Sequence, residues 1–374
     1  MPEIFVNSLL IVFGICFLIQ LVFLLFIYSG FAFRKKRNNV SNIGSPSVSV
    51  IICARNEERF IEKNLTQVLE QDYPSYEVIV VNDCSTDGTQ QVLDEMQKKY
   101  PNLRSLIIQE GYVYKHSKKL PLTIGIKNAQ YEYLVFTDAD CRPAGKGWLR
   151  DIIGAFDADT EIVLGYGAYA RTRGFVNSLI RMDTFQIGLQ YMSLALAGMP
   201  YMGVGRNLAY KKSLFLKQKG FAPYTHVPSG DDDLFVNKAA TRFNTRIAAC
   251  PDCVTISEPK PSFKEWVRQK RRHVSTAKYY KGSTLFTLGI ITFSQYFFWL
   301  SFVALLFTSW WNIAVALFSI RLLMQMLIYG KAMRKLGESD LLLYSPVIEW
   351  LLLFAFYPGV AVSNMLFKEA KWKT

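Results

Sequence analysis

A long segment without any charged residue, Ile4 to Phe33, constrains this chain of 374 residues more than any other feature. It exceeds the roughly 20 apolar residues that a helix needs to cross the hydrocarbon core of a bilayer. The segment is too long for a cleaved signal peptide, and neither a basic region before it nor a small-residue cleavage site after it is present. We therefore expect a transmembrane helix over residues 1–33.

Basic residues follow this segment directly. The sequence "RKKRNN" at Arg34–Asn39 is a flank that the positive-inside rule places on the cytoplasmic side of the membrane. The turn-forming residues of "SNIGSPS" then favour a linker. Residues 34–46 are thus expected to join a membrane anchor to a cytoplasmic domain.

Further apolar segments lie between residues 283 and 374. The stretch Ser283–Gly330 is long enough for two spans with a turn near Ser309–Asn312, and the basic "KAMRKLG" after it would be cytoplasmic again. A last apolar block, Leu341–Phe367, contains two prolines and a glutamate. It either crosses once, which leaves the basic tail "KEAKWK" outside, or forms a re-entrant hairpin. We expect two to three spans here, and hence an integral, multi-pass protein of the cell (inner) membrane.

Charge and cysteine content narrow the classes of partner. The formal net charge is +13, which favours attraction to anionic lipid headgroups and to a phosphate-bearing substrate. No nucleic acid is expected, because the sequence shows no nucleic-acid recognition motif. The six cysteines form no disulfide framework, and "CPDC" at Cys250–Cys253 is interpreted as structural. This usage fits a reduced cytosolic compartment.

The region between residues 47 and 261 alternates strand-like and helix-like patterns. Such alternation predicts a parallel sheet with right-handed crossovers, that is, a Rossmann-like half-domain of the α/β class. The expected strands are Ser47–Ala54, Glu77–Asp83, Leu103–Gln109 and Tyr131–Asp140, and the expected helices are Glu57–Gln71, Thr89–Lys99 and Lys118–Ala129.

Two carboxylates separated by one residue, Asp138 and Asp140, end the apolar run "EYLVF". Residues two apart on a strand point the same way, so both side chains can converge on one cation. Carboxylate oxygens suit Mg²⁺ or Mn²⁺, which usually hold substrate phosphates as well. Acidic residues also end strands simply by starting a turn. We nevertheless expect a metal site here, because the pair stands at a predicted sheet edge, where open α/β sheets bind ligands.

Polar residues follow the neighbouring strands at the same edge. Asn56 and Glu57 follow the first strand in "ARNEE", and Asp83 ends the second in "VNDCSTDGT", where the acids also suit a turn or a helix cap. Such groups suit a nucleobase and a ribose. Lys118 precedes a predicted helix, where a cation and free backbone amides favour a diphosphate, although an isolated lysine is usually just a surface residue.

Two later motifs complete the candidate site. Arg206 and Asn207 occupy a glycine-rich turn, "GVGRNLAY", which also occurs as a plain turn. Three successive acids, Asp231 to Asp233, either cap a helix or provide a general base. Crowding of like charges should raise at least one of their pKa values toward neutral pH, as a base requires.

The segment Phe263–Thr276 has the pattern of a basic amphipathic helix just before a membrane span, and we delimit this region as residues 262–282. Lys, Arg and Trp266 would anchor it at the interface. Gln269, Arg272 and His273 are candidates to face the active site as well, although a lone histidine is more often structural.

These motifs, in this order, resemble the membrane-embedded branch of family-2 glycosyltransferases related to cellulose synthase and ceramide glucosyltransferase. The resemblance covers roughly Ser47 to His273. It implies a GT-A fold with flanking transmembrane helices, a nucleoside site that includes Ala54 of "ARNEE" and Asp83, and a metal–diphosphate site at Asp138 and Asp140.

The resemblance also assigns the remaining motifs. "GDDD" corresponds to the family's threonine–glutamate–aspartate motif, which makes Asp232 the base, or Asp231 if the alignment shifts by one residue. "QKRRH" corresponds to the glutamine-x-x-arginine-tryptophan motif, with His273 in place of tryptophan. That replacement argues against stacking on an acceptor sugar, and with it against a processive polymer synthase.

The resulting hypothesis is an inverting, metal-dependent glycosyltransferase at the cytoplasmic membrane face. Its donor would be a nucleotide sugar, a UDP-sugar by default, and its acceptor a lipid or lipid-linked saccharide. A processive polysaccharide synthase is the main alternative; a nucleotidyltransferase and a non-enzymatic scaffold are further ones. The apolar stretch Phe185–Gly203 is equally suited to a buried core helix and to the wall of a membrane-facing acceptor groove.

Overall fold

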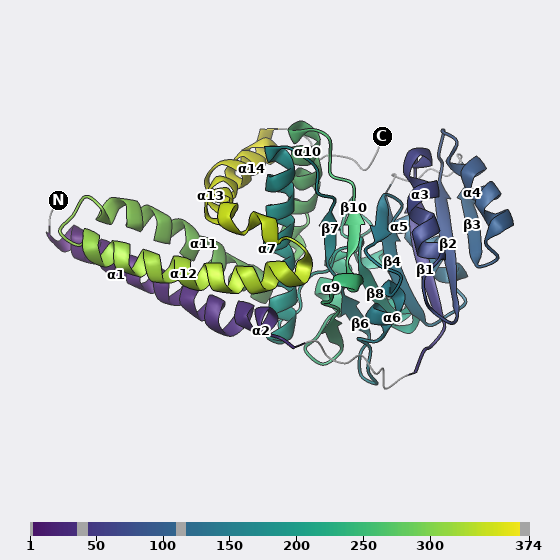
Figure 1. Ribbon diagram of the computed structural model, residues 1–374, viewed down its shortest axis with the longest axis horizontal. Coiled ribbons are helices and arrows are strands. Elements are labelled where there is room, and N and C mark those ends of the chain that lie inside the picture. Colours follow the sequence, from purple (N-terminus) through teal and green to yellow (C-terminus); the bar gives the residue numbers. More distant parts are fainter. Residues whose placement is uncertain (1–2, 36–43, 110–116, 367–374) are drawn as a thin grey trace.

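The computed structural model describes residues 3–35, 44–109 and 117–366. A sheet domain lies at one end of the molecule, and long apolar helices extend away from it at the other (Figure 1). The basic flank at Arg34–Asn39 and the linker fall partly outside the described residues, and the basic tail falls wholly outside them.

Four parallel strands form the half of the central sheet that the sequence predicts. Their order is β3-β2-β1-β4, and all neighbours pair in parallel. Intervening helices make the crossovers, so the predicted α/β alternation is confirmed. The strands are β1 (Val48–Ala54), β2 (Tyr76–Asp83), β3 (Leu103–Ile108) and β4 (Tyr133–Asp138), and the helices are α3 (Glu58–Leu69), α4 (Thr89–Lys99) and α5 (Lys119–Asn128).

Strand β1 shows why this half of the sheet forms. Ile51 and Cys53 pack into one apolar cluster, whereas Val50 and Ile52 pack into another on the opposite face. Alternate residues of a strand point to opposite faces, so a strand that is apolar throughout can be buried on both sides. The continuous apolar runs in the sequence encode this two-sided burial.

The other half of the sheet is not purely parallel. Strand β8 (Leu208–Lys211) lies antiparallel between β4 and β6 (Ile162–Leu164), and β9 (Thr245–Ile247) pairs in parallel with β6. The predicted parallel half-domain is confirmed as far as β4, and the mixed half beyond it was not predicted from the sequence. A small second sheet has the order β5-β10-β7, with β5 (Cys141–Pro143), β10 (Thr255–Ser257) and β7 (Gly167–Tyr169).

Four helical stretches of the described chain are long and apolar enough to cross a membrane: Glu3–Ala32, Gly282–Leu305, Trp311–Leu336 and Ser339–Leu366. The first comprises α1 (Glu3–Val22), the π-helical η1 (Phe23–Tyr28) and α2 (Ser29–Ala32); the second and third are α11 and α12. Outward-facing apolar side chains such as Phe286 and Phe307 are exposed, as expected for a lipid-facing surface.

The last apolar block forms one helical run rather than a hairpin. It consists of η5 (Ser339–Tyr344), α13 (Ser345–Leu351), the π-helical η6 (Leu352–Phe356) and α14 (Tyr357–Leu366). Figure 1 shows α13 and α14 close to α7 and α10, set apart from the bundle of α1, α11 and α12. The alternative of a re-entrant hairpin is therefore wrong for the described part of this block.

Helix α7 (Phe175–Leu196) joins the two parts of the molecule. It packs against β7 and β9 of the sheet domain and against α2, η1, α12 and α13 of the helical part. On α7, the guanidinium of Arg181 donates to Glu338 at 2.8 Å and, through two bonds, to Asp340. The segment Phe185–Gly203 is helical as far as Leu196, and this mostly buried helix also contacts the membrane-type helices. Several residues of the segment, among them Gln190 and Met202, line a cavity as well.

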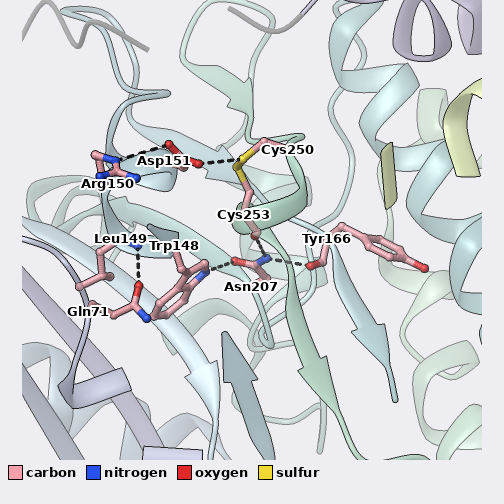
Figure 2. The surroundings of a disulfide bond; sticks show 9 residues. All are labelled: Gln71, Trp148, Leu149, Arg150, Asp151, Tyr166, Asn207, Cys250 and Cys253. Atoms are coloured by element: carbon pink, nitrogen blue, oxygen red, sulfur yellow. Dashed lines mark hydrogen bonds and ion pairs between the residues drawn. A yellow bond between two sulfur atoms is a disulfide. The ribbon is translucent and has the colours of Figure 1, made fainter. Parts of the chain in front are cut away.

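Helix α6 (Trp148–Ile153) and the 3₁₀ turn η3 (Pro251–Cys253) meet at a disulfide bond. Cys250 and Cys253 are bonded to each other, and the Asp151 carboxylate lies 3.2 Å from the Cys250 sulfur (Figure 2). The sequence predicts no disulfide, so this pair is a correction. The bond closes a short turn, which agrees with a structural role for "CPDC".

Candidate active site

One cavity of about 1220 Å³ lies between the sheet domain and the helical part. It collects most of the residues that the sequence singles out, although they come from distant parts of the chain. Eleven of the predicted site residues line it: Asn56, Glu57, Lys118, Asp138, Asp140, Arg206, Asp231, Asp232, Gln269, Arg272 and His273. Three do not: Ala54, Asp83 and Asn207.

The two acids at the end of β4 lie where the strand pattern places them. Ligand atoms of Asp138, Asp140 and Cys141 are all within 4.8 Å of one another. The Ser257 hydroxyl donates to Asp140 at 3.2 Å and fixes one of its oxygens. Two adjacent hard oxygen donors are what a Mg²⁺ or Mn²⁺ ion requires from protein.

Lys118 supplies the counter-charge for these acids. Its ammonium group bonds Asp138 and lies 4.0 Å from Asp231. Burial opposes the charged form of Lys118, but Asp138 and Asp231 raise its pKa above the usual value. Burial would likewise raise the pKa of Asp138, yet Lys118, Arg206 and Arg272 lower it. This carboxylate therefore stays ionised at neutral pH.

The loops after β1 and β2 lie side by side, as the parallel order predicts. The Asn56 side chain accepts from the backbone amide of Thr86 at 2.9 Å, and the backbone amide of Asn56 donates to the Ser85 hydroxyl at 3.0 Å. Asn56 has a positive φ of 54°, which asparagine tolerates better than most residues. Asp83 is fully buried behind this loop pair, with a guanidinium nitrogen of Arg55 at 3.9 Å.

The glycine-rich turn before β8 separates two neighbouring residues. Arg206 lies over the ring of Tyr169 at 4.2 Å and lines the cavity. Asn207 points inward and is fully buried. Figure 2 shows its amide group between Trp148, which donates to it at 3.1 Å, and the carbonyls of Tyr166 and Cys253. Asn207 thus anchors the turn rather than reaching the cavity.

The three consecutive acids have different surroundings. Asp233 accepts hydrogen bonds from Thr276 and, at 2.8 Å, from Tyr280, and Asp231 lies near Lys118. Asp232 accepts from the backbone amides of Gly205 at 2.7 Å and of Asp233 at 2.8 Å. Burial, followed by the charges of Asp231 and Asp233, raises the pKa of Asp232 to about 7. Among the three, Asp232 has the properties that a general base needs at neutral pH.

Helix α10 (Phe263–Val274) borders the cavity with the predicted "QKRRH" residues. Gln269 donates to the Tyr169 hydroxyl at 3.1 Å. Desolvation within the cavity wall and the charge of Arg272 lower the pKa of His273 well below its usual value. Trp266 is buried and stacks on Phe356 at 3.9 Å. The predicted anchoring of Trp266 at a lipid interface is therefore wrong.

Lys119 is a residue whose position the sequence did not reveal. Its buried ammonium donates to three backbone carbonyls of the loop before the acids, those of Tyr224, Val227 and Ser229. This loop is about a hundred positions away in the chain. The sequence singles out Lys118 because it precedes a predicted helix. No sequence signal distinguishes the neighbouring Lys119.

Residues 49–215 match the family described as Glycosyl transferase family 2. The matched range includes the acids at the end of β4 and the turn at Arg206. The poly(ribitol-phosphate) beta-glucosyltransferase of Bacillus spizizenii is 27% identical over 194 residues, which are 51% of this chain and 29% of that protein. The beta-monoglucosyldiacylglycerol synthase of Synechocystis is 28% identical over 148 residues, covering 39% and 29% of the two chains.

A solved mannosyltransferase from Pyrobaculum calidifontis shares the fold with a TM-score of 0.64 and 20% sequence identity. The superposition covers 97% of this chain and 99% of that one. The likeness therefore extends beyond the sheet domain to the helices that follow it. The two curated relatives named above, in contrast, are matched over less than a third of their own length.

Proposed function

Because the chain carries a glycosyl transferase family 2 domain, we propose that it transfers a sugar from a nucleotide sugar to a lipid or lipid-linked saccharide. The transfer takes place at the cytoplasmic face of the membrane, depends on a divalent cation and inverts the anomeric centre. One observation carries this proposal. A single cavity brings the acid pair Asp138 and Asp140 together with the half-buried Asp232, whose pKa is raised to about 7.

The acid pair fits a divalent cation. Asp138 and Asp140 offer oxygen atoms within 4.8 Å of each other, and Lys118 already places one positive charge against Asp138. A Mg²⁺ or Mn²⁺ ion held by these residues would neutralise charge on a departing nucleoside diphosphate. The similarly folded mannosyltransferase was solved with GDP-mannose and Mn²⁺, so GDP-sugars belong beside UDP-sugars among the candidate donors.

Basic side chains of the chain itself complete the diphosphate site. Lys118, Arg206 and Arg272 all line the cavity, and the charges of all three lower the pKa of Asp138, which supports a role beside the acid pair. These three basic side chains would hold the diphosphate and share its growing negative charge as the sugar leaves. Asn56 and Glu57, at the neighbouring strand ends, would contact the nucleoside.

Asp232 acts as the base in a single displacement. The acceptor hydroxyl gives its proton to the Asp232 carboxylate while its oxygen forms a bond to the anomeric carbon. The bond from that carbon to the diphosphate breaks at the same time, and the nucleoside diphosphate takes the electron pair. Attack opposite the leaving group inverts the anomeric centre, and no covalent enzyme intermediate is needed.

The helical walls of the cavity support a membrane-borne acceptor. Residues of η1, α11, α12 and α13 line the same cavity as the acids, and each belongs to a stretch long enough to cross a membrane. A hydroxyl group carried by a lipid could therefore reach Asp232 from the bilayer. The Synechocystis relative named above is a glucosyldiacylglycerol synthase, a precedent for a lipid product within the family.

Nucleoside diphosphate release from a panel of UDP-, GDP- and dTDP-sugars tests the proposal. The purified full-length protein is assayed in lipid extract with Mg²⁺ or Mn²⁺, beside an Asp140→Ala variant. We expect cation-dependent release with one donor and its loss in the variant. Release that persists with chelator and in Asp140→Ala would contradict metal dependence, and pyrophosphate release would indicate a nucleotidyltransferase. Chain length of the product separates single transfer from processive synthesis.

A further inference from the structure

Five polar side chains of the helical part line the same cavity as the acids, and we name this part of its wall the inner chamber: Tyr28, Gln186, Gln190, Tyr329 and Glu349. These side chains come from η1, α7, α12 and α13. Polar side chains are costly inside a membrane and usually serve a function there. The chamber therefore needs an explanation beyond packing.

Two polar groups of the inner chamber are held in place by hydrogen bonds. Gln190 accepts from the Tyr201 hydroxyl at 2.8 Å. Glu349 is buried, accepts from Gln325 and forms an ion pair with Arg321 at 3.4 Å. Amide and phenol groups in fixed positions are the donors and acceptors that match hydroxyl groups.

A chain of contacts connects the chamber with the acids. The Tyr201 hydroxyl donates to Gln190 at 2.8 Å, and the Tyr201 ring lies 6.0 Å from that of Tyr280. Tyr280 in turn donates to Asp233, the neighbour of Asp232, at 2.8 Å. A group seated in the chamber is therefore only a few side chains away from the proposed base.

The charge of the chamber differs from that of the outer cavity. The lysines and arginines that line the cavity, within the described chain, belong to α5, the turn before β8, and the segment around α10: Lys118, Arg206, Lys260, Lys264, Arg268, Lys270 and Arg272. None belongs to η1, α7, α12 or α13 of the described part. Among the five described residues that define the chamber, only Glu349 is ionisable as an acid at neutral pH, and Arg321 pairs with it at 3.4 Å. These residues therefore offer a phosphate no unpaired cation.

An apolar wall stands beside the polar groups. Leu288 and Ile291 of α11 and Leu352 and Leu353 of η6 line the same cavity. Both η1, which ends at Tyr28, and η6 are π-helical, a local widening that often marks functional positions in helices. The chamber thus offers hydrogen bonds on one side and hydrocarbon contact on the other.

From this arrangement we infer that the inner chamber binds an uncharged, hydroxyl-rich headgroup attached to a hydrocarbon chain. This deepens the function proposed above and rests on it: the acceptor is a neutral glycolipid or polyol lipid rather than a lipid phosphate. Gln186 and Gln190 bind the headgroup hydroxyls, and the leucines and isoleucine contact the chain.

The test uses two amphiphiles that differ only in the headgroup, octyl β-D-glucopyranoside and octyl phosphate, added below solubilising concentration to the full-length protein in lipid nanodiscs. Thermal unfolding reports binding without turnover. We expect octyl glucoside to raise the unfolding temperature of the wild type, and the gain to be lost in Gln186→Leu and Gln190→Leu. Losing one or two hydrogen bonds at about 1 kcal/mol each should weaken binding roughly 5- to 30-fold.

Gln67→Leu, on helix α3 outside the cavity, is the matched control and should keep the full response. Greater stabilisation by octyl phosphate, or an undiminished response in both chamber variants, would overturn the inference. Nucleoside diphosphate with Mn²⁺ is titrated in parallel. If the wild type does not respond to nucleoside diphosphate with Mn²⁺, the result counts against the proposed function. If the chamber variants keep this response, only their acceptor side has changed.

Discussion

Three consecutive aspartates, Asp231 to Asp233, have chemically identical side chains but different surroundings. Asp231 lies beside Lys118, Asp233 is bonded by Thr276 and Tyr280, and Asp232 accepts hydrogen bonds from two backbone amides. Sequence alone left Asp231 and Asp232 as alternatives, because an ambiguity of one position in an alignment cannot be resolved without these partners. The environment favours Asp232 as the base.

The pH dependence of turnover follows from this environment. Burial and the charges of Asp231 and Asp233 raise the pKa of Asp232 to about 7, while Gly205 and Lys118 act in the opposite direction. A base must be deprotonated, so kcat should rise about tenfold per pH unit below 7 and level off above it. Asp231→Asn removes one raising charge and should move the inflection to lower pH. Profiles of kcat from pH 5 to 9 that show no inflection near 7, or the same one in both proteins, would be inconsistent with this assignment.

Lys119 should contribute to the stability of the loop before the acids. Lys119→Met leaves buried carbonyls without their donor, and each unsatisfied group costs about 1–3 kcal/mol. We expect a marked drop in unfolding temperature and faster proteolysis near residues 222–230. Lys127→Met, an exposed change at the end of the same helix, is the control and should behave like the wild type. Equal behaviour of the two variants would show that the three carbonyl contacts do not stabilise the loop.

At the scale of the element, the cluster around Arg181 fixes α7 against the end of α12. Its guanidinium is 4% exposed and pairs with both Glu338 and Asp340, and Glu338 also accepts from Tyr166 of the cavity wall at 3.2 Å. Arg171 pairs with the same Asp340 at 3.4 Å but is 72% exposed. The two arginines therefore form a natural comparison.

Arg181→Met should destabilise the protein by about 3–5 kcal/mol, because it leaves the buried Glu338 carboxylate without its partner. Arg171→Met should cost less than about 1 kcal/mol, since water screens an exposed pair. Equilibrium unfolding in detergent measures both. Similar values for the two variants would mean that burial of the Arg181 pair does not set its strength.

Elements with strong periodicity could be predicted from the sequence. The apolar runs of β1, β2 and β4 are long enough to identify buried strands, and α4 has the bounds Thr89–Lys99 that the pattern indicates. Strand β8 is only four residues long, and its antiparallel pairing depends on partners more than forty positions away, so local patterns say nothing about it. Trp266 looks interfacial in sequence, yet Phe356 covers it from another helix.

The candidate site was partly predictable for the same reason. Residues at the ends of predicted strands, such as Asp138 and Asn56, reach the cavity because parallel order brings strand ends together. Asn207 shares a turn with Arg206, but the two side chains point to opposite sides, and no sequence pattern tells which one faces outward.

In the whole molecule, the sheet domain and the α11–α12 turn should lie on opposite sides of the membrane. Gln91→Cys on α4 and Asn312→Cys in that turn, both exposed positions, test this topology. A membrane-impermeant maleimide should label Gln91→Cys in inside-out vesicles and Asn312→Cys in right-side-out vesicles. The wild type provides the background from native cysteines. Labelling of both positions from the same side would rule out the arrangement.

The role of Asp232 as the base is tested by the transfer rate of Asp232→Asn under single-turnover conditions, with donor binding measured on the same preparation. Asparagine keeps the size of the side chain but cannot accept the acceptor proton. We predict that the rate falls about 10²–10⁴-fold while donor affinity stays within a few-fold of the wild type. A variant that binds donor and transfers sugar at nearly the wild-type rate would contradict the claim that Asp232 is the base of a glycosyltransferase.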